Sequence, residues 1–298
     1  LNKTRGRASG PFFVPAIRWM YDRSAMALDE QFIVRLITFI LQEHPAMFQR
    51  SLPVFLLVIV CSMGCKKEED DPEPTPTPST PAPEYMVSVN FNFLEGSLPW
   101  AFADQLVDED GAAALLDRMR FVVSNIRLLD NSGSLIKSFP GVVLKVDRAS
   151  GNGITQDLGL MGQGAIPRIA FDLGLDDANN ALAPSDFNVP PLNDQTLYQS
   201  EALGYKFLEI TGRWNSNGDL LINSSDEAIQ YVPATASMRR PVTLQVDEYN
   251  AYPGAVIHLR VQMTDFLNGI HFDTAPTAIG AGLPTAQLMN NLQAAIQH

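Results

Sequence analysis

The sequence predicts an all-β domain: a β-sandwich with Greek-key-like connections and a short C-terminal helix. Two observations favour this class. Seven segments rich in β-branched and aromatic residues follow one another after residue 85, separated by turns rich in glycine and asparagine. Only two short helical segments are predicted among them, as expected for a sandwich. The 214 residues from 85 to 298 suffice for one domain of this kind.

The first predicted strand, residues 86–93, alternates most regularly. Its valines and phenylalanines fall on one side, and a serine and two asparagines fall on the other, which is the period of a half-buried strand. The other strands are predicted, in chain order, at residues 119–129, 142–147, 166–173, 205–214, 241–249 and 256–266. Turns are predicted at 131–133, 151–153 and 215–218, where glycine and asparagine accept positive φ.

Two helices are predicted in this domain. Residues 111–119 form the first, with Asp110 as its N-cap. Residues 284–296 form the second, because Leu288, Leu292 and Ile296 recur every four residues and Pro284 suits a first helical turn. We expect the second helix to pack across the sandwich.

Residues 47–64 have the layout of a secretory signal peptide. Arg50 precedes a short apolar run, and Gly64 is a small residue directly before Cys65. The apolar run is far shorter than the roughly 20 residues that span a bilayer. The sequence before Cys65 resembles a bacterial lipobox, so Cys65 is the predicted lipidation site. The alternative is a buried hydrophobic hairpin with two ordinary cysteines.

Residues 1–46 are a doubtful upstream segment, because a signal peptide lies at the N-terminus of its protein and Met47 is the natural start. The alternative is an N-terminal helix on the membrane surface. Residues 65–84 are predicted to be a tether, charged at first and then rich in proline, which favours an extended polyproline II conformation. Residues 85–298 are then one displayed domain.

The charges of residues 66–71 resemble a signal that exports lipoproteins to the outer face of the outer membrane; the alternative is that they only keep the tether soluble. The predicted location is therefore the outer membrane, at the periplasmic face or at the cell surface.

Residues 85–298 hold 12 Lys and Arg against 23 Asp and Glu, a net charge of −11. Such a domain repels phosphate backbones, so no nucleic-acid partner is expected. No catalytic motif is recognisable, so the chain is predicted not to be an enzyme.

Four segments and the C-terminal helix sequence resemble the methanobactin-associated, MbnP-like copper-binding domain family. The segments are RMRFVVSNIRLLDNSGSLI (118–136), FDLGLDDANNAL (171–182), LGYKFLEITGRW (203–214) and HLRVQMTDFLNG (258–269). The resemblance implies an exported, β-rich domain that binds copper through histidines, beside an oxidatively modified tryptophan. It also implies a dihaem cytochrome peroxidase-like partner that performs the oxidation.

The candidate residues for such a site are few. The candidate copper ligands are His258, His271 and His298, and the candidates for a redox-modified tryptophan are Trp100 and Trp214. The tryptophans that relatives carry ahead of the GYK glycine are missing at residues 197–202. Each candidate also has an ordinary alternative. The alternation of its strand places His258 on a polar face, and Asp273 lies two residues from His271 as a carboxylate partner. His298 is the last residue. Both tryptophans can be packing residues.

Two functions follow from these observations. The first is a lipid-anchored copper-binding protein for metal capture or homeostasis, with a metal site that has lost some of its ligands. The second is a surface lipoprotein that recognises a protein or a glycan without catalysis.

Overall fold

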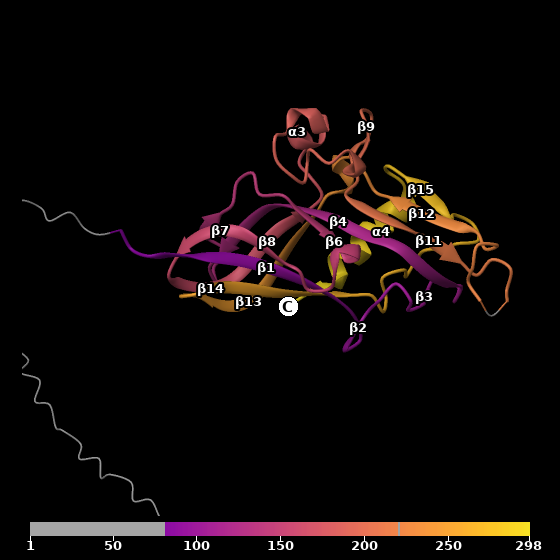
Figure 1. Ribbon diagram of the computed structural model, residues 1–298, viewed down its shortest axis with the longest axis horizontal. Coiled ribbons are helices and arrows are strands. Elements are labelled where there is room, and N and C mark those ends of the chain that lie inside the picture. The colour runs from indigo at the N-terminus through magenta and orange to yellow at the C-terminus, as the bar shows by residue number, and fades with distance from the viewer. Residues whose placement is uncertain (1–80, 220) are drawn as a thin grey trace, which may run out of the picture. The chain divides into compact units, whose positions relative to one another are not determined.

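The predicted β-sandwich is present (Figure 1). The structure, a computed structural model, describes residues 81–219 and 221–298. The doubtful upstream segment (residues 1–46), the predicted signal peptide, Cys65 and most of the tether lie outside these residues. The sandwich belongs to a compact unit that covers Ser79–His298.

The first sheet is built around the first predicted strand. Its order is β16 (Ile296–Gln297), β14 (Gly254–Gln262), β1 (Glu84–Glu95) and β2 (Leu98–Pro99), and β7 (Thr155–Gly162) also pairs with β1. β1 and β14 run parallel although about 170 residues separate them in the chain. This parallel pair differs from the antiparallel strands of a Greek key, so it does not support the predicted Greek-key-like connections.

The second sheet is larger and centres on the long strand β4. Its order is β13 (Arg240–Asn250), β8 (Gly164–Leu173), β4 (Ala113–Leu129), β11 (Leu208–Trp214), β12 (Ala228–Val232) and β15 (Thr277–Ile279). Three short strands also pair with β4: β3 (Leu106–Val107), β5 (Leu135–Ser138) and β6 (Leu144–Asp147). The chain passes between these two sheets at six connections: β2–β3, β6–β7, β7–β8, β13–β14, β14–β15 and β15–β16.

Aromatic side chains join the two sheets. Phe91 of β1 packs edge-on against Phe121 of β4 and Phe171 of β8, with ring centroids 5.6 and 6.2 Å apart. The apolar face predicted for β1 is thus the core face. Its polar face is more buried than the half-buried strand that the sequence predicts. On this face, Ser88 donates a hydrogen bond to Asp157 (2.7 Å) and Asn90 donates one to the carbonyl of Gly153.

The helix predicted at residues 111–119 is wrong. These residues enter β4, which begins at Ala113 and whose buried Ala114 and Leu116 alternate with more exposed neighbours. Pairing with β11 overrides the helix propensity of an alanine- and leucine-rich segment. Asp110 is therefore not a helix N-cap.

The C-terminal helix is confirmed as α4 (Leu283–Ala295), with its proline in the first turn. Leu288 and Leu292 are fully buried, and the helix contacts β12, β13, β14 and β15. Ile296 continues in extended conformation and opens β16. Among the described residues, no helix is both long and apolar enough to cross a membrane.

A segment between β8 and β11 projects from the sandwich (Figure 1). It carries the one-turn helix α3 (Asp177–Asn180), two 3-10 turns (Pro184–Asp186 and Gln195–Leu197) and the hairpin of β9 (Tyr198–Ser200) and β10 (Gly204–Tyr205). Asp176 caps α3, since its side chain accepts from the backbone N–H of Asn179. Two further 3-10 turns lie at Arg148–Ser150 and Ala236–Met238.

Candidate functional site

His271 forms an ion pair with Asp110 at one end of the second sheet. The imidazole Nδ1 lies 2.6 Å from a carboxylate oxygen of Asp110, and both side chains are about half exposed. The partner of His271 is thus Asp110 of the loop before β4, 161 residues away, and not its neighbour Asp273. Sequence spacing gave no signal for this pair, because only the fold brings the two loops together.

The acidic neighbours of Asp110 fasten these loops. Asp108 is buried, and its carboxylate accepts from the backbone N–H groups of Asp110 (3.0 Å), Ala112 (2.7 Å) and Phe272 (3.0 Å). Glu109 accepts from the N–H of Gly269 at 3.0 Å. His271 and Asp110 are therefore held face to face by backbone contacts on both sides of each residue.

The pKa of His271 is raised above its ordinary value, chiefly by the hydrogen bond to Asp110. Desolvation is the next largest effect and lowers the pKa, and the charges of Asp110, Asp108 and Asp273 raise it. In neutral His271, a proton on Nδ1 donated to Asp110 leaves the lone pair of Nε2 free. This is how a carboxylate orients a histidine that ligates a metal through its other nitrogen.

Of the two candidate tryptophans, Trp214 is the one near this pair. Its ring packs against Phe272, the residue after His271, with centroids 6.2 Å apart. Trp100 is fully buried beneath Arg148, whose guanidinium donates to the Trp100 carbonyl at 2.5 Å and lies 5.9 Å from the ring centroid. Both rings thus have packing roles, and Trp214 is the one that packs against the neighbour of His271 in sequence.

The other two histidines belong elsewhere. His258 is exposed on β14 opposite Asn90 of β1, as the strand alternation predicts. His298 lies 3.8 Å from Glu248 of β13. Within residues 81–219 and 221–298, no three histidine, cysteine or acidic side chains converge as a metal site would require. The described residues therefore fit one imidazole ligand for copper, with a carboxylate beside it, and not a closed copper centre.

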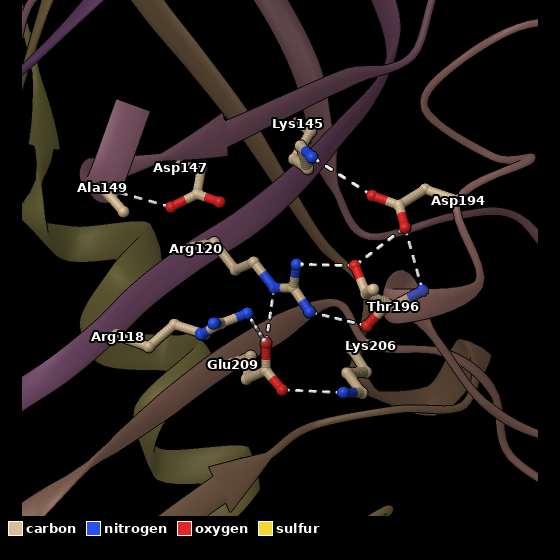
Figure 2. Close-up of polar contacts among 9 residues, drawn as sticks. All are labelled: Arg118, Arg120, Lys145, Asp147, Ala149, Asp194, Thr196, Lys206 and Glu209. Carbon is tan, nitrogen blue, oxygen red and sulfur yellow. Dashed lines mark hydrogen bonds and ion pairs between the residues drawn. The ribbon is translucent and has the colours of Figure 1, made fainter. Parts of the chain in front are cut away.

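Sequence reasoning missed a buried cluster of charges between β4 and the projecting segment (Figure 2). Arg120 Nε lies 2.5 Å from Glu209 Oε2 with both side chains under 10% exposed, and Lys206 Nζ lies 2.7 Å from the other oxygen of Glu209. The Arg120 guanidinium also donates to the carbonyl (2.6 Å) and the hydroxyl (3.0 Å) of Thr196.

Asp194 extends this cluster. It accepts from the backbone N–H of Thr196 at 2.9 Å and pairs with Lys145 of β6 at 3.2 Å. Burial acts to raise the pKa of Asp194, but the bonds from Thr196 and Lys145 outweigh it and lower the pKa. The cluster thus ties the projecting segment to β4, β6 and β11. The signal that could have found it is the charged residues placed inside otherwise apolar strand sequences, such as Arg120 and Glu209.

The fold and the site define a β-sandwich domain that presents the His271–Asp110 pair at one end of a sheet. The MbnP family profile matches residues 85–281, more than half of the chain, and the chain belongs to this family. Among solved structures, MbnP from Methylosinus trichosporium is similar with a TM-score of 0.42 and 15% identity, over 62% of this chain and 78% of that chain. No curated protein matches.

Proposed function

We propose that the chain is a lipid-anchored, exported copper-binding protein that captures metal through His271. The observation that carries this is the His271–Asp110 pair, which orients an exposed imidazole with Nε2 free. Imidazole is a preferred copper donor, and the net charge of −11 attracts cations to the domain. The remaining coordination positions are open to water or to a partner's side chain.

The anchor and the partner belong to the same proposal. A lipid on Cys65 and the proline-rich tether hold the domain at the outer membrane, at its periplasmic face or at the cell surface. Trp214 is the residue that a dihaem cytochrome peroxidase-like partner would oxidise, since it borders His271 through Phe272. The chain has no catalytic role of its own in this proposal.

Titration of the full chain with Cu(II), followed by calorimetry, tests the proposal. We expect one site, with an affinity that falls at least about tenfold in His271→Gln, because the substitution removes the only imidazole at the pair. His258→Gln is the matched control and should leave the affinity unchanged, since His258 is exposed on another strand. Equal binding by both variants would contradict the role of His271.

Recognition of a protein or a glycan is the second candidate function. The observation that favours it is that the described residues bring no three metal-binding side chains together. This function would predict no saturable copper binding in the same titration.

A further inference from the structure

An open cleft of about 570 Å³ lies at the C-terminal end of α4. The turn between β1 and β2, the end of β14 with the turn after it, and β16 form its other walls. The volume is in the range of sites for small organic ligands. The inference rests on four of the lining residues, Gln262, Asp265, Ala294 and Ala295. None of them belongs to the His271–Asp110 pair.

Hydrogen-bond acceptors in this cleft lack donors. The carboxylate of Asp265 is exposed, and no hydrogen bond or ion pair within the described part of the chain involves it. The amide nitrogen of Gln262 donates to the carbonyl of Gly96 at 2.8 Å, while its Oε1 is covered and accepts no hydrogen bond. Because protein atoms cover the Gln262 Oε1, the acceptor that a ligand in the cleft can reach is the exposed carboxylate of Asp265, which favours a ligand that donates hydrogen bonds.

The end of α4 adds negative potential to the cleft. A helix leaves its last carbonyl groups without intrahelical partners, and they carry a partial negative charge. Here Ile296 is extended (φ −82°, ψ 120°), so the helix has no left-handed capping turn, and its last turn holds no basic residue. Ala294 and Ala295, which line the cleft, lie in this last turn.

The lining contains no compensating cation. Lys, Arg and His are absent from the residues that line the cleft in the described part of the chain, and Asp265 is its one charged side chain. Arg260 pairs with Gln297 across β14 and β16 but is not part of the lining. Three features therefore favour a cationic ligand that donates hydrogen bonds: the free carboxylate of Asp265, a lining without Lys, Arg or His among the described residues, and a helix C-terminus.

We propose that this cleft binds an alkylammonium group. A metal ion fits less well, because the one carboxylate is not joined by two further metal-binding side chains and the cleft is much larger than an ion. An ammonium group supplies three hydrogen-bond donors and a positive charge on an apolar stem. The group belongs to a free diamine or to a lysine side chain of a partner protein, and the two sources share this chemistry.

Calorimetric titration of the full chain with two probes tests the proposal and separates the sources. Putrescine represents a free diamine, and Nα-acetyl-lysine methylamide represents a lysine in a protein; the tighter probe identifies the source. The control ligand is the same lysine derivative acetylated on Nε, which keeps the shape but removes the charge. We expect binding of at least one charged probe and none of the acetylated one. Failure of both charged probes to bind, or equal binding of the acetylated one, would overturn the proposal.

Three variants locate the site. Asp265→Asn removes the charge and should weaken binding at least about tenfold. Ala294→Lys, at an exposed helix position, places an ammonium group at the cleft and should abolish binding without unfolding the helix. Asp177→Asn removes an exposed charge on α3 and should change the affinity less than about twofold. Unchanged binding in Ala294→Lys would contradict the site even if Asp265→Asn failed to fold.

Discussion

Three consecutive acidic residues, Asp108, Glu109 and Asp110, perform different tasks. Asp108 and Glu109 accept backbone hydrogen bonds and hold two loops together, whereas Asp110 is exposed and faces His271. Composition alone suggests a cluster of cation ligands here. Backbone N–H groups bind the carboxylates of the buried Asp108 and the exposed Glu109, whereas the carboxylate of Asp110 faces His271 at the surface.

The pH dependence of copper binding follows from the raised pKa of His271. A proton and copper compete for the imidazole, so affinity should fall as the pH drops below the raised pKa of His271. Asp110→Asn should lower this pKa, because the carboxylate's hydrogen bond is the largest cause of the shift. Ring signals of the ¹⁵N-histidine-labelled chain, followed over pH, measure the pKa directly.

Rising pH should affect the folding stability and the copper affinity in opposite directions. Because the folded-state pKa of His271 is raised, its imidazolium stabilises the fold below the unfolded pKa, and this contribution disappears as the pH rises through the folded pKa. An unchanged His271 pKa in Asp110→Asn would contradict the orientation argument. Asp177→Asn is the control, since Asp177 lies on α3.

At the scale of elements, one buried cluster joins the projecting segment to the sheet. Arg120 and Glu209 lie on the neighbouring strands β4 and β11, and Thr196 and Lys206 come from the chain that leads into β11. These charged residues lie within or beside two of the segments that resemble the family, 118–136 and 203–214. Those segments are therefore recognisable partly because they build the fold, which is a separate matter from metal binding.

Glu209→Ala should destabilise the protein by about 3–5 kcal/mol, because it leaves the nearly buried guanidinium of Arg120 without its counter-charge. Urea unfolding of the full chain measures this loss. Glu227→Ala removes an exposed glutamate near β12 and should change the free energy of unfolding by no more than about 0.5 kcal/mol. A loss below about 1 kcal/mol in Glu209→Ala would show that the cluster does not hold this segment.

Local periodicity predicted the strands well where one face is apolar. The strands at 86–93, 166–173 and 241–249 and the helix at 284–296 all lie within one or two residues of the observed elements. The failure at 111–119 has a physical cause. A side chain at Gly212 of β11 would collide with the Leu115 carbonyl, so β4 and β11 approach closely there, and such a partner 97 residues away is invisible to local propensity.

The site was predictable in part. His271 was a candidate as one of the three histidines of the domain, with Asp273 as the carboxylate partner expected from the sequence, yet its partner is Asp110 on a distant loop. The exposure of His258 followed from strand alternation and is confirmed. The Arg120–Glu209 cluster was missed, because reasoning from periodicity assigns charged residues to solvent unless a partner in space is known.

At the scale of the whole molecule, we propose a lipid anchor and a tether ahead of one acidic domain. The anchor makes a prediction of its own. Intact mass of the protein from host membranes should equal the chain from Cys65 onward plus a lipid, because the signal cleavage that we propose lies directly before that cysteine. Cys65→Ser should remove the lipid and release the protein from the membrane fraction, whereas Cys61→Ser should change neither. Detection of a peptide from residues 1–46 would contradict the expected start.

The proposed capture of copper by His271 is tested most directly by finding which histidine binds the metal. The chain has only four histidines, so the ring spectrum of the ¹⁵N-histidine-labelled full chain contains four residues' signals. Substoichiometric Cu(II), which is paramagnetic, broadens the signals of the imidazole that it binds. We expect the His271 signals to disappear first and those of His44, His258 and His298 to persist. Earlier loss of another histidine's signals, or uniform loss of all four, would contradict this expectation.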